Sequence, residues 1–243
     1  MRQAPRDIEG WVRRFEAALK ADAGASWGAE AAGEGLGPVP GPEQVEALRE
    51  PWLAHYRLLL KWSGRARLVG DLDPREVASR HFLDALPLFP FFESLPAGAQ
   101  VVDIGSGAGF PALAVAPAFP ELRFHLVESD RRKLAFLKVV IAGLGLSQAR
   151  ASGTPAAGDP AGEGVPLGAL VLSRAFTGPA AWLSLARSYC APGGQILCLT
   201  GGGTPKEEVE AAAAAAGLLP GARWSGSLPG GRGERAISAW RLA

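Results

Sequence analysis

The sequence contains no asparagine, although alanine, glycine and arginine are abundant. This imbalance indicates a coding bias rather than a chemical requirement, so an asparagine used by related proteins could be missing here for compositional reasons. Cysteine is also scarce, because only Cys190 and Cys198 occur. Two cysteines are too few for a disulfide framework, and their spacing is not that of paired metal ligands. We therefore expect no metal site and a reducing, cytoplasmic location.

Long apolar runs and a large net charge are missing as well. The N-terminal stretch MRQAPRDIEG lacks the apolar core of a signal peptide, and no apolar run is long enough to cross a bilayer. The 243 residues carry a formal net charge of +1 and are 48% hydrophobic. This composition is typical of a globular chain with one main core, and we expect a monomer without membrane contact. The small net charge argues against a surface that is basic all over and binds nucleic acid, but it does not exclude a local basic patch.

A glycine-rich stretch, VVDIGSGAGFPAL, spans residues 101–113. Its apolar start predicts a buried strand, and its alternate glycines lead into an apolar helical pattern. Such glycines accept positive φ angles and let a ligand approach the backbone beside a helix start. Phe110 stands where a dinucleotide fingerprint needs glycine or alanine, and no Gly-Lys-Ser/Thr follows as in a phosphate loop. The carboxylate of Asp103, at the end of the strand, would repel a pyrophosphate but suits a cationic ligand that carries an amino acid.

A second acidic residue, Glu128, ends the apolar strand predicted from Leu122 onward. An open α/β sheet places a ribose-binding carboxylate at about this position. The two acids and the glycines resemble the first motif of class I S-adenosylmethionine-dependent methyltransferases, which implies a Rossmann-like, doubly wound α/β sheet. The candidate residues for binding S-adenosylmethionine are Asp103, Gly105, Ser106, Gly107, Gly109, Phe110, Glu128 and Ser129.

The residues before this stretch predict helices. Apolar residues at helical spacing predict an amphipathic helix over residues 7–20 with Asp7 as its N-cap. Residues 21–43 lose this period and are rich in Gly, Ala and Pro, which predicts a flexible linker. The pattern over residues 43–62 predicts two helices divided near Pro51, because proline cannot continue the preceding helical hydrogen bonds.

The Asp73-Pro74-Arg75-Glu76 sequence combines an N-cap, a proline at the first helical position and a glutamate at the third, which predicts a helix through Leu86. His81 and Asp84 are three residues apart on this helix and can lie side by side. On its own, such a pair is more often a structural hydrogen bond than a catalytic dyad.

The rest of the chain predicts a second half of the sheet. We expect a domain over residues 96–243, preceded by a helical extension over residues 1–95. Within the domain, residues 156–166 are rich in Gly, Pro and Ala and are expected to be mobile. Further elements are predicted as a strand ending near Arg174, a helix over 179–190, a strand over 195–200, a helix start at 204–207 and a closing strand from about 233.

Three stretches in combination resemble the RsmG family, also called glucose-inhibited division protein B. They are RHFLDAL over residues 80–86, VVDIGSGAGFPALAVA over 101–116 and VESDRRKLAFLKVV over 127–140. The resemblance runs, with gaps, from about Trp62 to the C-terminus. Family members are bacterial enzymes that methylate N7 of a guanine in 16S ribosomal RNA. The resemblance therefore implies S-adenosylmethionine as methyl donor and 16S ribosomal RNA or the small ribosomal subunit as partner.

Arg174 is the candidate catalytic residue, because ligands of open α/β sheets bind beyond the carboxyl ends of the strands and family members carry a similar Arg-Ala pair there. The Asn/Asp-Pro-Pro-aromatic motif of aminomethylases is absent, which disfavours methylation of an exocyclic amine. The basic residues at 131–133 could equally form a solvated helix face or an RNA contact. The candidate substrate or RNA residues are Arg67, Arg80, His81, Asp84, Arg131, Arg132, Lys206 and Arg235.

The chain departs from the family pattern at three places. A Gly-Arg-Ala-Glu stretch that lines the adenine is reduced to Gly153, which leaves Thr154 as a candidate there. A Lys-Gly pair after the fifth strand is replaced by glycines, with Lys206 as a possible displaced cation. Residues 62–69 lack both asparagines and the threonine of Trp-Asn-x-x-x-Asn-Leu-Thr. These departures leave open two alternatives: methylation of another RNA or a small molecule, and a non-catalytic module that binds S-adenosylmethionine or RNA.

Overall fold

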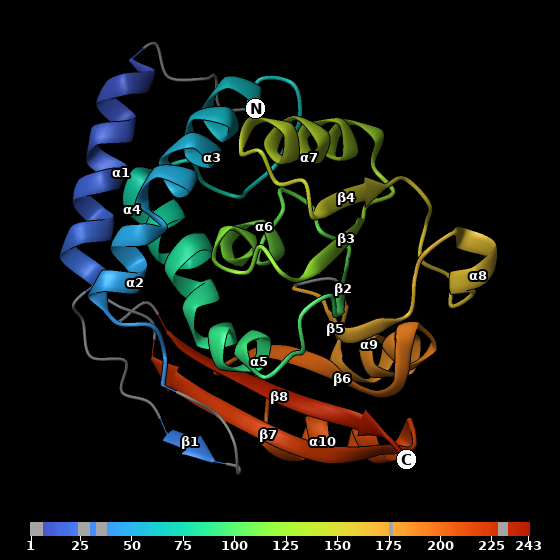
Figure 1. The fold of residues 1–243 in the computed structure, drawn as a ribbon. Helices are drawn as coiled ribbons and strands as arrows, with labels where there is room; N and C mark the ends of the chain where they lie inside the picture. Colours follow the sequence, from blue (N-terminus) through green and yellow to red (C-terminus); the bar gives the residue numbers. More distant parts are fainter. Residues whose placement is uncertain (1–6, 24–29, 33–37, 175–176, 228–232) are drawn as a thin grey trace.

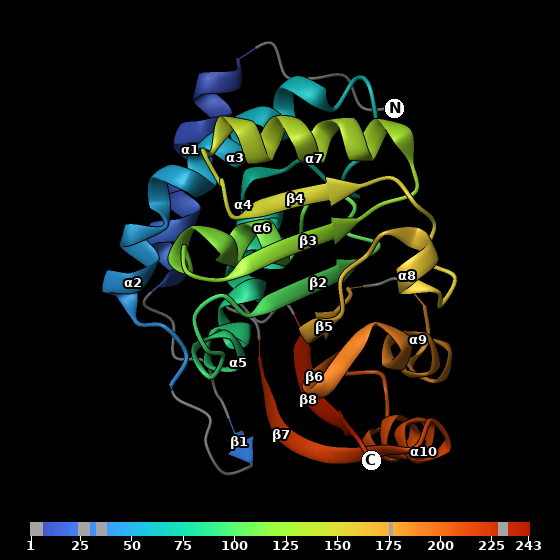
Figure 2. The ribbon, with the colours of Figure 1, turned by 45° about the vertical axis from the view of Figure 1, so that its right-hand side comes forward.

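A single mixed sheet forms the centre of the molecule. The computed structural model describes residues 7–23, 30–32, 38–174, 177–227 and 233–243. The strands in these residues are β1 (Glu30–Ala32), β2 (Gln100–Ile104), β3 (Arg123–Val127), β4 (Ala149–Ser152), β5 (Gly168–Leu172), β6 (Cys190–Gly201), β7 (Leu218–Ser227) and β8 (Glu234–Leu242). They lie in the order β1-β7-β8-β6-β5-β2-β3-β4 (Figures 1 and 2). This arrangement confirms the predicted doubly wound α/β sheet.

The parallel strands end together at one edge of the sheet. β2 pairs in parallel with β3 and with β5, and Asp103 is in register with Leu126 on one side and Leu172 on the other. In Figure 2 the arrowheads of β2, β3 and β4 point the same way. β8 runs antiparallel between β6 and β7. Residues that follow the carboxyl ends of β2, β3 and β5 are therefore neighbours in space.

Helical segments cover both faces of the sheet. The α-helices are α1 (Ile8–Ala23), α2 (Pro42–Ala47), α3 (Arg49–Trp62), α4 (Pro74–Val77), α5 (Phe89–Glu93), α6 (Ala112–Val115), α7 (Arg131–Gly143), α8 (Pro160–Glu163), α9 (Pro179–Ala186) and α10 (Lys206–Ala215). Shorter turns are the π-helical η1 (Ala78–Phe82) and the 3-10 segments η2 (Leu83–Leu88), η3 (Ala116–Ala118) and η4 (Arg187–Tyr189).

Alternation along the strands divides the core into two parts. Val101 and Leu170 join a cluster with α1, α3, the segments from α4 to α6, and α7. Val102 and Val171 point to the other face and join a cluster with α9 and α10. Successive side chains of a strand face opposite sides, so the same alternation that builds the two cores places Asp103 on the face of Val101. The N-terminal helices share their core with the sheet, and the expected division near residue 95 stays a prediction.

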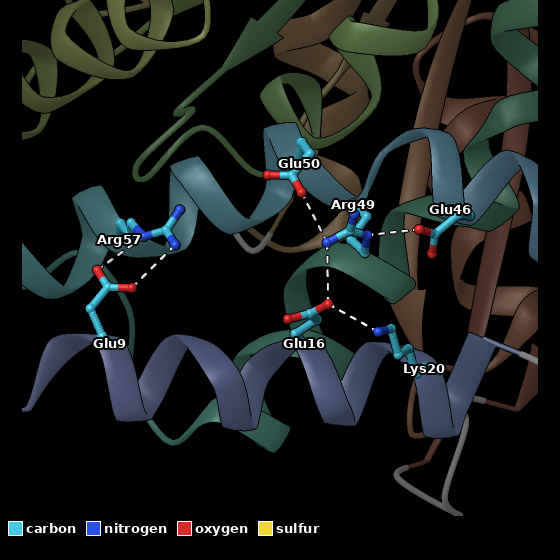
Figure 3. A network of polar contacts seen from close by, with 7 residues as sticks. All are labelled: Glu9, Glu16, Lys20, Glu46, Arg49, Glu50 and Arg57. Carbon is cyan, nitrogen blue, oxygen red and sulfur yellow. Dashed lines mark hydrogen bonds and ion pairs between the residues drawn. The ribbon is translucent and has the colours of Figure 1, made fainter.

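Ion pairs join α3 to α1 and to α2 along their exposed sides (Figure 3). Arg57 of α3 lies 3.2 Å from Glu9 of α1, and Arg49 lies 3.2 Å from Glu16. Further pairs within this network connect Arg49 with Glu46 and Glu50, and Lys20 with Glu16. Because these groups are largely exposed, each pair contributes at most about 1 kcal/mol to stability. The apolar contacts of Phe15 and its neighbours in the core provide the main attachment of α1.

Several predicted boundaries differ from the structure. Within the stretch expected to be a flexible linker, α1 continues to Ala23, and Glu30–Ala32 form an edge strand paired with β7. The break between α2 and α3 lies at Leu48 rather than near Pro51, because proline is accommodated in the first turn of α3, where a backbone N–H has no helical partner. Within residues 156–166, expected to be mobile, α8 forms a turn capped by Asp159.

The helix predicted over residues 73–86 is not a regular α-helix. Asp73 caps α4 by accepting hydrogen bonds from the backbone N–H groups of Arg75 and Glu76, as predicted. The segment then widens into the π-helical turn η1 and tightens into the 3-10 segment η2. Such irregular turns are frequent at functional sites, and this one carries His81.

Candidate active site

The glycine-rich loop turns from β2 toward α6 through three residues with positive φ. Gly105, Gly107 and Gly109 have φ angles of 72°, 57° and 89°, a region that L side chains rarely adopt. A Cβ at Gly107 would have its nearest neighbour at 3.9 Å, so this position faces open space. The hydroxyl of Ser106 donates to the carbonyl oxygen of Asp103 at 2.8 Å and closes the turn. The loop is therefore a fixed backbone cradle with an open side.

Glu128 braces this cradle from the end of β3. One carboxylate oxygen accepts from the backbone N–H of Gly107 at 2.9 Å, and the other accepts from the N–H of Asp130 at 2.8 Å. The side chain is buried, whereas the next residue, Ser129, is exposed. A carboxylate offers about four lone-pair sites, so both oxygens retain capacity to accept from the hydroxyl groups of a ribose.

Asp103 carries a buried carboxylate without a hydrogen-bond partner. The residue is 1% exposed, and neither carboxylate oxygen has a partner among the residues that the structure describes. Burial raises the pKa of Asp103 to about 7, and the Glu128 carboxylate adds to this, while Ser106 and the positive charge of Arg174 oppose it. The carboxylate that the sequence places at the end of the strand is thus enclosed by the protein. A buried, unpaired acceptor gains free energy when a cationic donor reaches it.

Phe110 packs its ring between two histidines. Its centroid lies 4.8 Å from that of His55 and 4.9 Å from that of His81, with interplanar angles of 8° and 20°. The Nε2 atom of His55 lies 3.0 Å from the carbonyl oxygen of Ala108, within the glycine-rich loop. Burial lowers the pKa of His55 to about 4, so its ring is neutral and donates this hydrogen bond. The stack ties α3, the loop and η1 together.

Arg174 lies at the centre of the polar side of the site. One of its Nη atoms donates to the backbone oxygen of Arg80 at 2.9 Å, and the other lies 2.6 Å from Nδ1 of His81. The guanidinium carbon is 5.6 Å from the centroid of Phe110, within range of a cation–π contact. The side chain is 21% exposed and forms an ion pair with Asp84 at 3.5 Å. Arg174 is therefore partly buried against the cradle and is not a free surface charge.

Asp84 is held between two arginines. Nε of Arg235 donates to its two oxygens at 3.1 and 3.4 Å, opposite the contact with Arg174. Burial raises the pKa of Asp84 above its usual value, while Arg174 and Arg235 act in the opposite direction. No direct hydrogen bond joins His81 to Asp84 among the described contacts; instead, Arg174 contacts both. The predicted pair thus becomes a cluster whose members come from η1, η2, the end of β5 and β8.

A cavity of about 360 Å³ opens beside this cluster. Its lining comes from η1, η2, Arg174 and residues of β6, β7 and β8. The lining residues are Arg80, His81, Asp84, Pro87, Arg174, Leu199, Thr200, Gly201, Trp224, Arg235, Ala236 and Ile237.

The remaining candidate residues lie outside this cavity. Arg67 is exposed and lines a second cavity of about 430 Å³ between α3 and α4. Arg131 and Arg132 are exposed in the first turn of α7. Lys206 lies on α10, where it is 55% exposed and pairs with Glu210 at 3.3 Å. The structure therefore gives Lys206 a helix-surface contact and no place in the cavity beside Asp84.

The segment after β4, where an adenine contact was expected, is only partly buried. Thr154 is half-buried two residues beyond the end of the strand. A Cβ at Gly153 would come within 2.7 Å of a Leu134 methyl group, so α7 packs closely against this backbone. This close packing is consistent with the glycine that the chain keeps at position 153.

Two buried residues that the sequence analysis did not single out support the site. His55 contacts the backbone of the glycine-rich loop at Ala108. The hydroxyl of Ser173 donates to the carbonyl oxygen of Ile104 at 2.6 Å, which joins the ends of β5 and β2. His55 could have been found from the sequence, because it is a polar residue on the apolar face of a predicted helix. The sequence contains no such signal for Ser173, because its role depends on the pairing of two strands that are distant in sequence.

The described residues offer neither a metal site nor a membrane-spanning helix. No group of three or more His, Cys, Asp or Glu side chains in the described part of the chain is arranged to hold a metal ion. Likewise, none of its described helices is both long and apolar enough to cross a membrane. Cys190 and Cys198 are buried free thiols, and burial raises the pKa of each to about 11. Both thiols are therefore protonated at neutral pH.

Comparison with known proteins identifies the family. The ribosomal RNA small subunit methyltransferase G of Anaeromyxobacter sp. is 37% identical over 208 residues, which covers 85% of this chain and 94% of that protein. The Myxococcus xanthus protein of the same name is 39% identical over 158 residues, covering 65% and 70%. A solved S-adenosylmethionine-dependent methyltransferase of Geobacter sulfurreducens, in complex with S-adenosyl-L-homocysteine, is 18% identical with a TM-score of 0.47, covering 63% and 72%. The family model described as rRNA small subunit methyltransferase G matches residues 50–221, and the chain therefore belongs to this family, GidB.

Proposed function

We infer that this chain transfers a methyl group from S-adenosylmethionine to N7 of a guanine in 16S ribosomal RNA. Membership of the GidB family supports the reaction and the RNA. The observation that carries the assignment to this site is the glycine-rich loop, which contacts the Arg174 cluster through Phe110. A donor-binding loop and a polar cavity thus adjoin at the carboxyl edge of the sheet, where open α/β sheets bind their ligands.

The residues of the loop fit the methyl donor. The buried, unpaired carboxylate of Asp103 suits the ammonium group of the amino-acid part. Glu128 retains lone pairs for ribose hydroxyls, and the open side of Gly107 lets a ligand approach the backbone. Phe110 offers an apolar surface that excludes water. Gly105, Ser106, Gly109, Ser129 and Thr154 complete the proposed donor site.

The reaction needs positioning more than proton transfer. When bound, S-adenosylmethionine supplies a sulfonium methyl group: the N7 lone pair forms the new N–C bond, the C–S bond breaks with its electron pair left on sulfur, and the base takes the positive charge. N7 of guanine carries no proton, so no general base has to act. Correct placement of two reactants can contribute about 7–11 kcal/mol to lowering a barrier. The proposed role of Arg174 is to orient the target base or a neighbouring phosphate.

The proposed partner is the small ribosomal subunit or its RNA, bound by a local basic rim. Arg80, Arg174 and Arg235 lie at the cavity, and their charges suit RNA phosphates. Arg67, Arg131 and Arg132 are exposed on neighbouring elements and are proposed as further contacts. We further propose that the protein acts as a monomer in the cytoplasm.

Mapping of N7-methylguanine in ribosomal RNA tests this function. Small-subunit RNA from cells with and without the gene is compared, and the purified protein is then assayed on unmodified particles and on naked RNA. We expect one guanine to lose its N7-methyl group in the deletion strain and to regain it in the assay. An unchanged methylation pattern, together with no transfer to either substrate, would contradict the proposal.

A further inference from the structure

We propose that the cavity beside Asp84 receives the target guanine, and that Asp84 reads the base by accepting hydrogen bonds from its N1–H and N2–H groups. The inference rests on the proposed function. It adds a residue that determines base specificity and an orientation for the base. In this orientation the Watson–Crick edge faces Asp84, and N7, which lies on a different edge of the base, makes no contact with the carboxylate.

The cavity has the size and the chemistry of a purine site. Its volume of about 360 Å³ accommodates a single base with part of its sugar. Leu199, Trp224 and Ile237 contribute apolar surface to the lining, and Arg80, His81 and Arg235 are among its polar residues. Enzymes that modify bases hold the extruded base between apolar surfaces and read its Watson–Crick edge by hydrogen bonds.

Asp84 is fixed and retains acceptor capacity. Its side chain is only 8% exposed, and Arg174 and Arg235 hold the carboxylate from two sides. A carboxylate has about four lone-pair sites, and these contacts leave part of them available. Burial raises the pKa of Asp84, and the positive charges of Arg174 and Arg235 oppose this rise.

A carboxylate in this position selects guanine. Guanine presents two adjacent donors, N1–H and the N2 amino group, and a carboxylate can accept from both. Adenine presents an unprotonated N1 at the same place, whose lone pair would face the negative charge. The arginines cannot accept from N1–H or from the N2 amino group, because a guanidinium only donates. Among the described charged residues that line the cavity, Asp84 is the only carboxylate.

The cavity adjoins the methyl-donor loop through shared residues. His81 and Arg174 both line the cavity, and both contact Phe110, which belongs to the glycine-rich loop. The cavity and the loop are therefore connected through these two side chains.

The charge change of the reaction strengthens the same contact. The base becomes positive as the N7–methyl bond forms, so its N1–H becomes a stronger donor to the Asp84 carboxylate. An interaction that is stronger in the transition state than in the ground state raises kcat. Asp84 therefore contributes to turnover as well as to specificity.

The test uses small-subunit particles reconstituted with guanosine or inosine at the mapped target position. Inosine keeps N7 and N1–H but lacks the N2 amino group. We expect the wild-type protein to prefer guanosine by about tenfold in kcat/KM, the value of part of a bidentate contact. Asp84→Asn should lower kcat on the guanosine particle and transfer methyl groups to both particles at similar rates. Glu93→Gln, a matched change at the exposed end of α5, should keep the preference.

The outcomes separate this inference from the proposed function. Equal transfer by the wild-type protein to both particles, or a tenfold preference retained by Asp84→Asn, overturns the role of Asp84 while the methyltransferase activity stands. A wild-type protein that transfers to neither particle overturns the proposed function, and the inference with it. S-adenosylhomocysteine should bind Asp84→Asn as it binds wild type, which verifies that the variant is folded. If the variant does not fold, the ratio of kcat/KM on the guanosine and inosine particles still tests the inference for the wild-type protein, because a ratio of one contradicts it.

Discussion

The Nδ1 atom of His81 lies 2.6 Å from an Nη atom of Arg174. A guanidinium carries donors only, so Nδ1 accepts and the imidazole proton resides on Nε2. Burial lowers the pKa of His81 to about 3, and the positive charge of Arg174 contributes to this. His81 is therefore a neutral ring with one fixed tautomer, which holds the guanidinium in place beside the cavity.

None of the three histidines should gain a proton between pH 5.5 and pH 8. Burial lowers the pKa of His55 and of His125 to about 4 and that of His81 to about 3. The unfolded chain takes up these protons near pH 6.5, before the folded chain does. Each histidine should therefore destabilise the fold as the pH decreases from 6.5 toward 4, by about 1.4 kcal/mol per pH unit. NMR titration of the imidazole Cε1 protons measures the three pKa values, and a midpoint above 6 would contradict the expectation for that ring.

The local parts of the site could be predicted from the sequence. An apolar run followed by Asp103 and alternating glycines predicts a strand and a ligand loop, because both features depend on neighbours in the chain. The acidic end of β3 at Glu128 is equally local. The structure places these elements within one or two residues of their predicted positions.

The long-range parts could not be predicted in the same way. Asp84 and Arg235 are 151 positions apart, and nothing in either local pattern indicates their contact. The sequence of η1 has helical spacing, and only packing against Phe110 and Arg174 distinguishes a π-helical turn from an α-helix. β1 has three residues and lies within a stretch of linker composition, so its pairing with β7 depends on the finished sheet.

Asp103→Asn should separate donor binding from folding. The amide keeps the shape of the side chain but removes the buried negative charge, so binding of S-adenosylhomocysteine should weaken while the protein stays folded. Thermal shift measures both properties: the wild-type protein should gain stability with S-adenosylhomocysteine and not with NAD, and the variant should lose the gain. An unchanged ligand shift in the variant, or equal stabilisation by NAD, would contradict the role of Asp103.

The same variant should change how stability depends on pH. The pKa of Asp103 rises from 3.8 to about 7 on folding, so the folded chain holds this proton where the unfolded chain has released it. This contribution is fully present below pH 3.8 and is lost as the pH rises through 7, at about 1.4 kcal/mol per pH unit. In chemical denaturation without ligand, the wild-type protein should become less stable relative to Asp103→Asn between pH 5 and pH 8. A constant difference would show that the carboxylate has an ordinary pKa.

Arg174→Ala should lower methyl transfer to small-subunit RNA by about a hundredfold or more, as misplacement of a reacting group can. Donor affinity should stay near that of the wild type, because Arg174 contacts the rear of the loop at Phe110 and makes none of the described contacts to Glu128. Arg235 still pairs with Asp84 in the variant, so the loss of stability should be roughly 1–3 kcal/mol. Activity, donor affinity and stability are measured on one preparation by methyl transfer, donor titration and denaturation. Full transfer activity would remove Arg174 from the site.

Arg131→Ala should weaken binding to small-subunit RNA without changing methyl transfer at saturating RNA. Arg131 is exposed in the first turn of α7, directly after the loop that carries Glu128 and Asp130, and it lies outside the cavity beside Asp84. Loss of one phosphate contact should reduce the slope of log K against log salt by about one unit. Lys138→Ala, an exposed cation on the same helix, is the matched control and should keep the slope. Because both variants remove one positive charge from α7, an equal effect of the two would indicate a response to net charge and not a contact of Arg131 with RNA.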